Sequence, residues 1–153
     1  MQGVNFSGLD DLDRKLKEVI SELPEAKREL HEEIAKGLKE EVDRQITASG
    51  VRDSSGRVQG WQKEHVGSRG GYAAIRPVAA STGNNSPGAI TNYLENGHRI
   101  REPGGNSQRY RPRIHKPYVD GYHFYQAAGN RAESKAIEAA ENFVEDMMRK
   151  LEE

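Results

Sequence analysis

Residues 8–48 read GLDDLDRKLKEVISELPEAKRELHEEIAKGLKEEVDRQITA, and this stretch decides the fold class. Apolar side chains recur every three or four residues with charges between them, which is the period of an amphipathic α-helix. The first run predicts a helix over 8–23 and comprises Leu9, Leu12, Leu16, Val19, Ile20 and Leu23. Because proline suits the first turn of a helix, Pro24 predicts that a second helix begins there.

The second predicted helix extends to Ala48, where Ser49-Gly50 breaks the pattern. Its apolar positions are Ala26, Leu30, Ile34, Leu38, Val42 and Ile46. A strict step of four residues drifts around a helix of 3.6 residues per turn, so the stripe winds across the surface. Such a helix is suited to contact more than one neighbour. Residues 127–151 carry a similar apolar pattern and predict a C-terminal helix.

The middle of the chain is polar and rich in glycine, which favours short strands and loops. We expect strands near 57–66, 72–78 and 119–125, a loop at 81–88, a helix or strand at 89–97, and a long hairpin or loop at 99–116. The predicted fold is therefore a single α+β domain over 1–153. Two N-terminal helices and one C-terminal helix would pack on a small, mainly antiparallel sheet, with a long mobile Arg/Gly-rich loop.

Composition and charge suggest a chain that meets partners. Hydrophobic residues are 34% and charged residues 31% of the 153 residues, so the core is small and a partner subunit could cover the remaining apolar surface. Twelve acidic and eight basic side chains give −4 over 1–48, eleven basic and five acidic give +6 over 49–130, and four basic and seven acidic give −3 over 131–153. This asymmetry fits either a nucleic-acid surface or attraction between copies.

Several function classes find no support in the residues. There is no cysteine, which excludes disulfides and thiolate metal sites. No apolar run approaches the roughly 20 residues of a membrane helix, and the N-terminus does not resemble a signal peptide, so we expect a soluble protein without membrane partners. No P-loop or G-x-S-x-G motif is present. We therefore expect no enzyme activity and no cofactor.

Glu95 and His98 have the spacing of an E-x-x-H metal pair, which His115 or His123 could complete. Such spacing is common by chance, and a metal site needs converging ligands with a second shell of hydrogen bonds. We favour the alternative, in which Asn96-Gly97 forms a turn and the two side chains cap it or pair with a neighbour.

A basic segment is the strongest electrostatic feature of the chain. Its interface or DNA-channel candidates are Arg99, Arg101, Arg109, Arg111, Arg113 and Lys116. These side chains could face DNA passing through a channel, because non-specific phosphate contact needs only positive charge. We favour the alternative, in which these side chains are solvated or pair with acidic helices of a neighbouring subunit.

Aromatic residues gather just before the C-terminal helix, at Tyr118, Tyr122, Phe124 and Tyr125. Aromatic side chains dominate both protein cores and interfaces. We favour a core role, in which the cluster seats the C-terminal helix.

Several stretches, in this order, resemble phage tail-completion (head–tail joining, or neck) proteins, the relatives of lambda's minor tail protein Z. They are the opening Val4-Asn5-Phe6-Ser7-Gly8-Leu9, the glycine segment Ser55–Trp61, the stretch Tyr72–Pro77, the stretch Asn92–Arg99, and Gly121-Tyr122-His123-Phe124. The stretch Leu94-Glu95-Asn96-Gly97-His98 is the most specific. The residues that match the family motifs are Tyr93, Glu95, Gly97, His98, Gly121 and Phe124.

The resemblance implies a structural virion protein that completes the tail and joins it to the head by ring assembly. The implied partners are other copies of the chain, as a ring that is hexameric in the virion, together with the head connector and the tail tube or terminator proteins. Passing DNA could also contact the ring non-specifically. The protein would be found in the host cytoplasm during assembly and then in the virion neck. The alternative is a nucleic-acid-binding module that uses residues 99–116.

Overall fold

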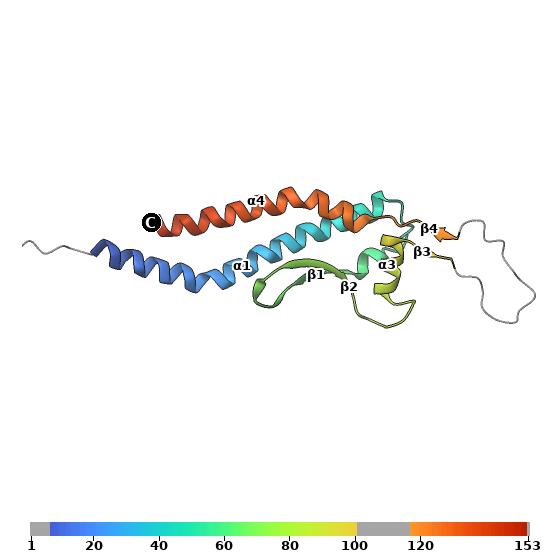
Figure 1. Cartoon of the computed structure of the whole chain (residues 1–153), viewed down its shortest axis with the longest axis horizontal. Coiled ribbons are helices and arrows are strands. Elements are labelled where there is room, and N and C mark those ends of the chain that lie inside the picture. The colour runs from blue at the N-terminus through green and yellow to red at the C-terminus, as the bar shows by residue number, and fades with distance from the viewer. Residues whose placement is uncertain (1–6, 101–116, 153) are drawn as a thin grey trace, which may run out of the picture. The chain divides into compact units, whose positions relative to one another are not determined.

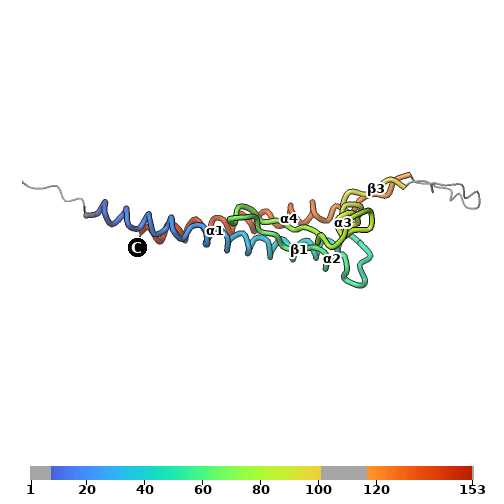
Figure 2. Tube along the Cα trace, turned by 90° about the horizontal axis from the view of Figure 1, so that it is seen from below, coloured from blue at the N-terminus to red at the C-terminus, as the bar shows by residue number. Residues whose placement is uncertain are grey.

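The computed structural model describes residues 7–100 and 117–152 (Figures 1 and 2). Helices and strands alternate in the order α1 (Ser7–Ala48), α2 (Arg57–Trp61), β1 (Gln62–Val66), the 3-10 turn η1 (Ser68–Gly70), β2 (Ala73–Pro77), α3 (Pro87–Asn96), β3 (His98–Arg99), β4 (Tyr118–Val119) and α4 (Phe124–Glu152). The α+β class predicted from the sequence is therefore confirmed.

The N-terminal region is a single helix of 42 residues, so the predicted division into two helices at Pro24 is wrong. Pro24 lies inside α1, where it cannot donate a backbone hydrogen bond to the carbonyl of Ile20. Both residues are exposed, so water can reach that carbonyl. The helix continues because the apolar stripe runs through the proline, from Leu23 to Ala26 and Leu30.

Within residues 7–100 and 117–152, the strands form two two-stranded sheets, β1–β2 and β3–β4. The connection from β1 to β2 is too short for a parallel crossover, so these strands form a hairpin. Strands β3 and β4 are antiparallel, with His98 opposite Val119 and Arg99 opposite Tyr118. These pairs make the sheet content small and antiparallel, as predicted.

Three predicted elements differ in their bounds. The strand expected at 57–66 is helical in its first half, as α2, and extended only in β1. The strand expected at 119–125 is limited to β4, because α4 already begins at Phe124. The stretch 89–97, predicted as a helix or a strand, is the helix α3. Its N-terminus is capped by the Ser86 hydroxyl, which accepts a hydrogen bond from the Ala89 N–H at 3.2 Å.

The contacts of the chain gather in two compact units. The first unit comprises residues 7–40, 64–75 and 131–152 of the described chain. The second unit comprises residues 41–63, 76–100 and 117–130. The two units share α1, β1, β2 and α4, and each is described separately below.

In the first unit, the N-terminal part of α1 and the C-terminal part of α4 lie side by side and antiparallel (Figure 1). The Lys150 ammonium near the end of α4 donates to the carboxylate of Glu22 on α1. The turn between β1 and β2 also rests on α1. Gly70 has φ +63° there, and a Cβ at this position would stand 2.8 Å from the Arg28 Cα, so only glycine fits.

The buried core lies mainly in the second unit. Among the described residues, five of the six buried hydrophobic side chains belong to it, namely Val42, Ile46, Val58, Phe124 and Ala128. The first unit contributes Ala35 alone. Its two long helices therefore leave most of their apolar side chains partly open to solvent. None of the described helices has the length and apolar character needed to cross a lipid bilayer.

Candidate functional site

The six residues that carry the family resemblance lie together in the second unit, although two separate stretches of sequence supply them. Tyr93 and Glu95 lie in the last turn of α3, and Gly97 and His98 follow it directly. Gly121 and Phe124 lie where the chain enters α4. We call this place the α3–α4 junction. Its geometry shows what these residue types do.

The backbone before α4 satisfies the end of α3. The Tyr122 N–H donates to the Leu94 carbonyl at 2.7 Å, and the His123 N–H donates to the Glu95 carbonyl at 3.1 Å. The last carbonyls of a helix have no partner within the helix. The two helix ends are therefore joined by hydrogen bonds in which both the donor and the acceptor are main-chain atoms.

The Glu95 carboxylate makes the reciprocal contact to the start of α4. It accepts hydrogen bonds from the Tyr125 N–H at 2.9 Å and from the Gln126 N–H at 3.2 Å. Glu95 is buried, with 9% of its surface exposed. A carboxylate at a helix N-terminus satisfies free N–H groups and interacts favourably with the helix dipole. Glu95 thus caps α4 from a position about thirty residues earlier in the chain.

Two glycines allow this close approach. Gly97 has φ +76°, and a Cβ there would lie 2.2 Å from the Val119 carbonyl oxygen. A Cβ on Gly121 would lie 2.1 Å from the Glu95 carbonyl oxygen. Both contacts are with backbone atoms, which cannot move aside cheaply. The glycines of the motif are therefore required by the junction itself.

The possible metal pair of Glu95 and His98 is not formed in the junction. The carboxylate of Glu95 faces the N-terminus of α4, while the His98 ring lies against the Tyr93 ring, with centroids 5.3 Å apart. The alternative that we favoured from the sequence was correct in assigning Glu95 a capping role. Its partner, however, is α4 and not the turn at Asn96-Gly97. Residues 7–100 and 117–152 contain no group of three or more side chains arranged to hold a metal ion.

A buried polar network lies beside the junction. The fully buried Gln62 amide donates to the Val58 carbonyl at 3.0 Å and to the Thr91 hydroxyl at 3.1 Å, and it accepts from the Tyr125 hydroxyl. Burial, together with the charge of Glu95, raises the pKa of Tyr125 to about 12. Gln62 and Thr91 were not predicted from the sequence, because no sequence pattern distinguishes a single buried polar residue from an exposed one.

The aromatic cluster divides between core and surface. Phe124 is fully buried, which confirms its predicted core role. Tyr125 is half-buried, and its ring lies against the Phe124 ring at a centroid distance of 5.0 Å. Tyr118 and Tyr122 are exposed. The Tyr118 hydroxyl donates to the Asn96 carbonyl at 2.7 Å, which fastens β4 to the end of α3.

The basic candidates are only partly described. Arg99 lies in β3 and is exposed. The other candidates lie outside the described residues, namely Arg101, Arg109, Arg111, Arg113 and Lys116.

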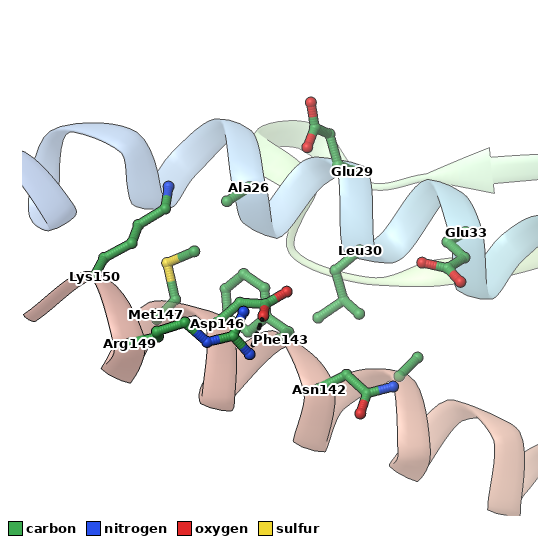
Figure 3. A pocket seen from close by; sticks show the side chains of 11 residues that line it. Ala26, Glu29, Leu30, Glu33, Asn142, Phe143, Asp146, Met147, Arg149 and Lys150 are labelled. Carbon is green, nitrogen blue, oxygen red and sulfur yellow. Dashed lines mark ion pairs between the residues drawn. The ribbon is translucent and has the colours of Figure 1, made fainter. Parts of the chain in front are cut away.

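The first unit contains a groove of about 600 Å³ between α1 and α4 (Figure 3). Leu30 of α1 and Phe143 and Met147 of α4 supply apolar surface to it. The polar side chains around it are Glu29, Glu33, Asn142, Asp146, Arg149 and Lys150. Arg149 pairs with Asp146 at 3.3 Å. The hydrogen bond to Glu22 raises the pKa of the Lys150 ammonium. The lining residues of the groove include carboxylates and cations but no histidine, serine or threonine.

A row of exposed apolar side chains runs along the same two helices. On α1 it comprises Leu9, Leu12, Leu16, Ile20 and Leu23, and on α4 it comprises Ile137, Val144 and Met148. Between 39% and 64% of each residue remains exposed. We call this set the apolar face. Exposed apolar residues that occur singly are ordinary on protein surfaces, whereas contiguous apolar patches mark interaction surfaces.

The chain matches no protein-family model, no curated protein and no solved structure.

Proposed function

We propose that the protein is a structural component of a phage neck, which completes the tail and joins it to the head by assembling into a ring. The observation that carries the proposal is the α3–α4 junction. The six residues on which the resemblance depends lie together and connect two helices. They serve the fold and leave the outer surfaces for assembly.

The loose packing of the first unit supports an assembly role. Its two long helices bury little of their own apolar surface, and the apolar face leaves eight large side chains open to solvent. Repeated contacts between copies, as in a closed ring, would bury such surface.

The proposal is tested in particles. A stop codon is introduced into the gene in its phage genome, and the lysate is examined by electron microscopy. We expect full heads and complete tails that remain separate, and joining restored by a plasmid copy of the gene. A plasmid copy with Glu138→Ala, an exposed change on α4, serves as the matched control and should also restore joining. Particles that join normally without the protein would contradict the proposal.

The nucleic-acid alternative makes a separate prediction. A module that binds through residues 99–116 should bind DNA tightly, and the logarithm of its affinity should fall steeply with the logarithm of salt concentration. We expect filter binding at two salt concentrations to show weak binding or none. Tight binding with a steep salt dependence would favour the module over the neck protein.

A further inference from the structure

We propose that the groove between α1 and α4 in one copy of this chain receives the basic segment, residues 99–116, of the next copy. This inference rests on the proposed function for the nature of the partner, and it deepens that function by naming the two surfaces that meet. Because the two surfaces are different patches of the chain, each copy offers one of them to each of two neighbours. Such a head-to-tail contact repeats from copy to copy and closes as a ring when its rotation allows.

The groove lies in an acidic part of the molecule, and the basic segment carries the opposite charge. Seventeen acidic and twelve basic side chains give the first unit −5 over residues 7–40, 64–75 and 131–152. Six basic side chains and one acidic side chain give +5 over 99–116. Opposite charges of this size draw the two surfaces together and disfavour contact of either surface with its own copy.

The charges that line the groove are only partly neutralised within the chain. Arg149 pairs with Asp146 at 3.3 Å, and Lys150 pairs with a glutamate near the middle of α1. The carboxylates of Glu29 and Glu33 also line the groove, are exposed, and make no ion pair with any residue in the described part of the chain. These two carboxylates are therefore available to cations from a neighbouring molecule.

The floor of the groove is apolar and partly open. Leu30 points from α1 towards α4, which contributes Phe143 and Met147 (Figure 3). All three side chains are only half-buried. The volume of about 600 Å³ is that of a pocket for a small ligand, so the groove has room for a few residues of peptide. A suitable occupant is therefore a short stretch that combines apolar side chains with positive charge.

The second half of the basic segment has both properties. Residues 109–114 read Arg-Tyr-Arg-Pro-Arg-Ile, and the proline favours an extended peptide over a helix. Side chains of an extended peptide alternate between its two sides, so a bound stretch would present the tyrosine and isoleucine on one side and the arginines on the other. The apolar side fits the floor of the groove. Arginine side chains are long enough to bend to carboxylates at its rim.

The spacing of the charges agrees with this arrangement. Glu29 and Glu33 lie one turn apart on α1, about 6 Å along the helix axis. Alternate side chains of an extended peptide repeat about every 6.6 Å. Two successive arginines of the stretch can therefore meet the two glutamates at the same time, and the planar guanidinium group is well suited to bind carboxylates.

The described chain holds both ends of the basic segment on the second unit. The Ile100 N–H donates to the Pro117 carbonyl at 2.9 Å, and Arg99 is exposed without an ion pair to any described residue. Eight residues of extended chain on each side reach up to about 26 Å from these ends. The length of the segment is therefore sufficient for its arginines to enter the groove of a neighbour while β3 and β4 stay paired.

Disulfide trapping tests which surfaces meet, because the natural chain has no cysteine. Copies with Glu33→Cys are mixed with copies with Tyr110→Cys and oxidised mildly. We expect linked dimers that contain one copy of each variant, since a disulfide forms only when the two Cα atoms come within about 7 Å. The control replaces the first variant by Glu138→Cys, an exposed position of α4 that does not line the groove, and should give far fewer mixed dimers.

Sedimentation equilibrium of the full chain gives an independent measurement. The wild type should self-associate, and the groove variant Glu29→Lys/Glu33→Lys and the segment variant Arg109→Gln/Arg111→Gln should each associate about a hundredfold more weakly. An equimolar mixture of the two variants should form mixed dimers and nothing larger, because one copy keeps the segment and the other keeps the groove. Circular dichroism checks that the variants remain folded.

Three results would overturn the inference. They are a yield of mixed disulfide dimers no higher than that of the Glu138→Cys control, a wild type that stays monomeric at every concentration, and self-association that the groove variant leaves unchanged. A segment that binds the groove of its own chain would give the first two results. None of the three affects the particle test above, which measures whether heads and tails join and not the surfaces through which copies meet.

Discussion

Replacing Glu95 by alanine should destabilise the chain through the start of α4. The change removes both acceptors of the Tyr125 and Gln126 N–H groups, which lie at 2.9 and 3.2 Å from the carboxylate. Hydrogen bonds to a charged group contribute about 1.5–3 kcal/mol each, and the two share one carboxylate, so we expect a loss of about 2–4 kcal/mol. For a chain of this size that corresponds to a fall in Tm of about 5–15 °C.

The isosteric change separates charge from shape. Glu95→Gln keeps the side-chain volume and one acceptor oxygen, but its amide N–H₂ cannot accept the second backbone hydrogen bond. The favourable interaction of the charge with the helix dipole is also lost. We expect Glu95→Gln to cost about half as much as Glu95→Ala, or roughly 1–2 kcal/mol.

Urea unfolding followed by circular dichroism at 222 nm measures both variants, with Glu138→Ala on the exposed side of α4 as the control. Hydrogen exchange gives a local readout, because the amides of Tyr125 and Gln126 should lose protection first. If Glu95→Ala unfolds within about 0.5 kcal/mol of the control, the capping role of Glu95 is refuted.

The glycines of the α3–α4 junction and the half-buried Tyr125 give further predictions. Gly97→Ala and Gly121→Ala should each lower the Tm strongly, because the added Cβ would lie 2.2 and 2.1 Å from backbone oxygens. Gly37→Ala should raise the Tm, because Gly37 lies inside α1 with open space around it. Thermal melts of the three variants test these expectations. Tyr125 should ionise at about pH 12. In an absorbance titration of tyrosine ionisation, the difference between the wild type and Tyr125→Phe should therefore have its midpoint near that pH. Because the folded-state pKa lies above the ordinary value of 10, stability from Tyr125 is fully present below pH 10 and is lost as the pH rises towards 12; a wild type no more sensitive than Tyr125→Phe in urea melts over this range would contradict this.

Helical periodicity could be read from the sequence because it is local. The spacing of apolar residues identified the helical regions of α1 and α4, although Leu9, Leu12 and Ile20 of the predicted apolar side are exposed. The division at Pro24 was wrong because a proline starts a helix only where its neighbours leave the preceding turn unformed. In α1 the leucines on both sides of Pro24 belong to one stripe, and water can reach the carbonyl that the proline leaves without a donor.

The junction could be predicted only in part. The stretch around Glu95 and Gly97 stood out, and its glycines pointed to a turn. The hydrogen-bond partner of Glu95 could not be predicted, because it is the backbone of α4 about thirty residues away. Backbone N–H groups are the same at nearly every position of a sequence. Gln62 presents the same difficulty, since its burial follows from contacts with Thr91 and Tyr125 that only the folded chain brings together.

The pairing of β3 with β4 has a practical consequence for engineering. The Ile100 N–H donates to the Pro117 carbonyl at 2.9 Å, so the two ends of the intervening sequence are held next to each other by the described chain. Closing a longer loop between fixed ends costs only about 0.6 kcal/mol for each doubling of its length. A change in the length of the sequence between these two fixed ends should therefore cost little, and the protein should keep both of its long helices.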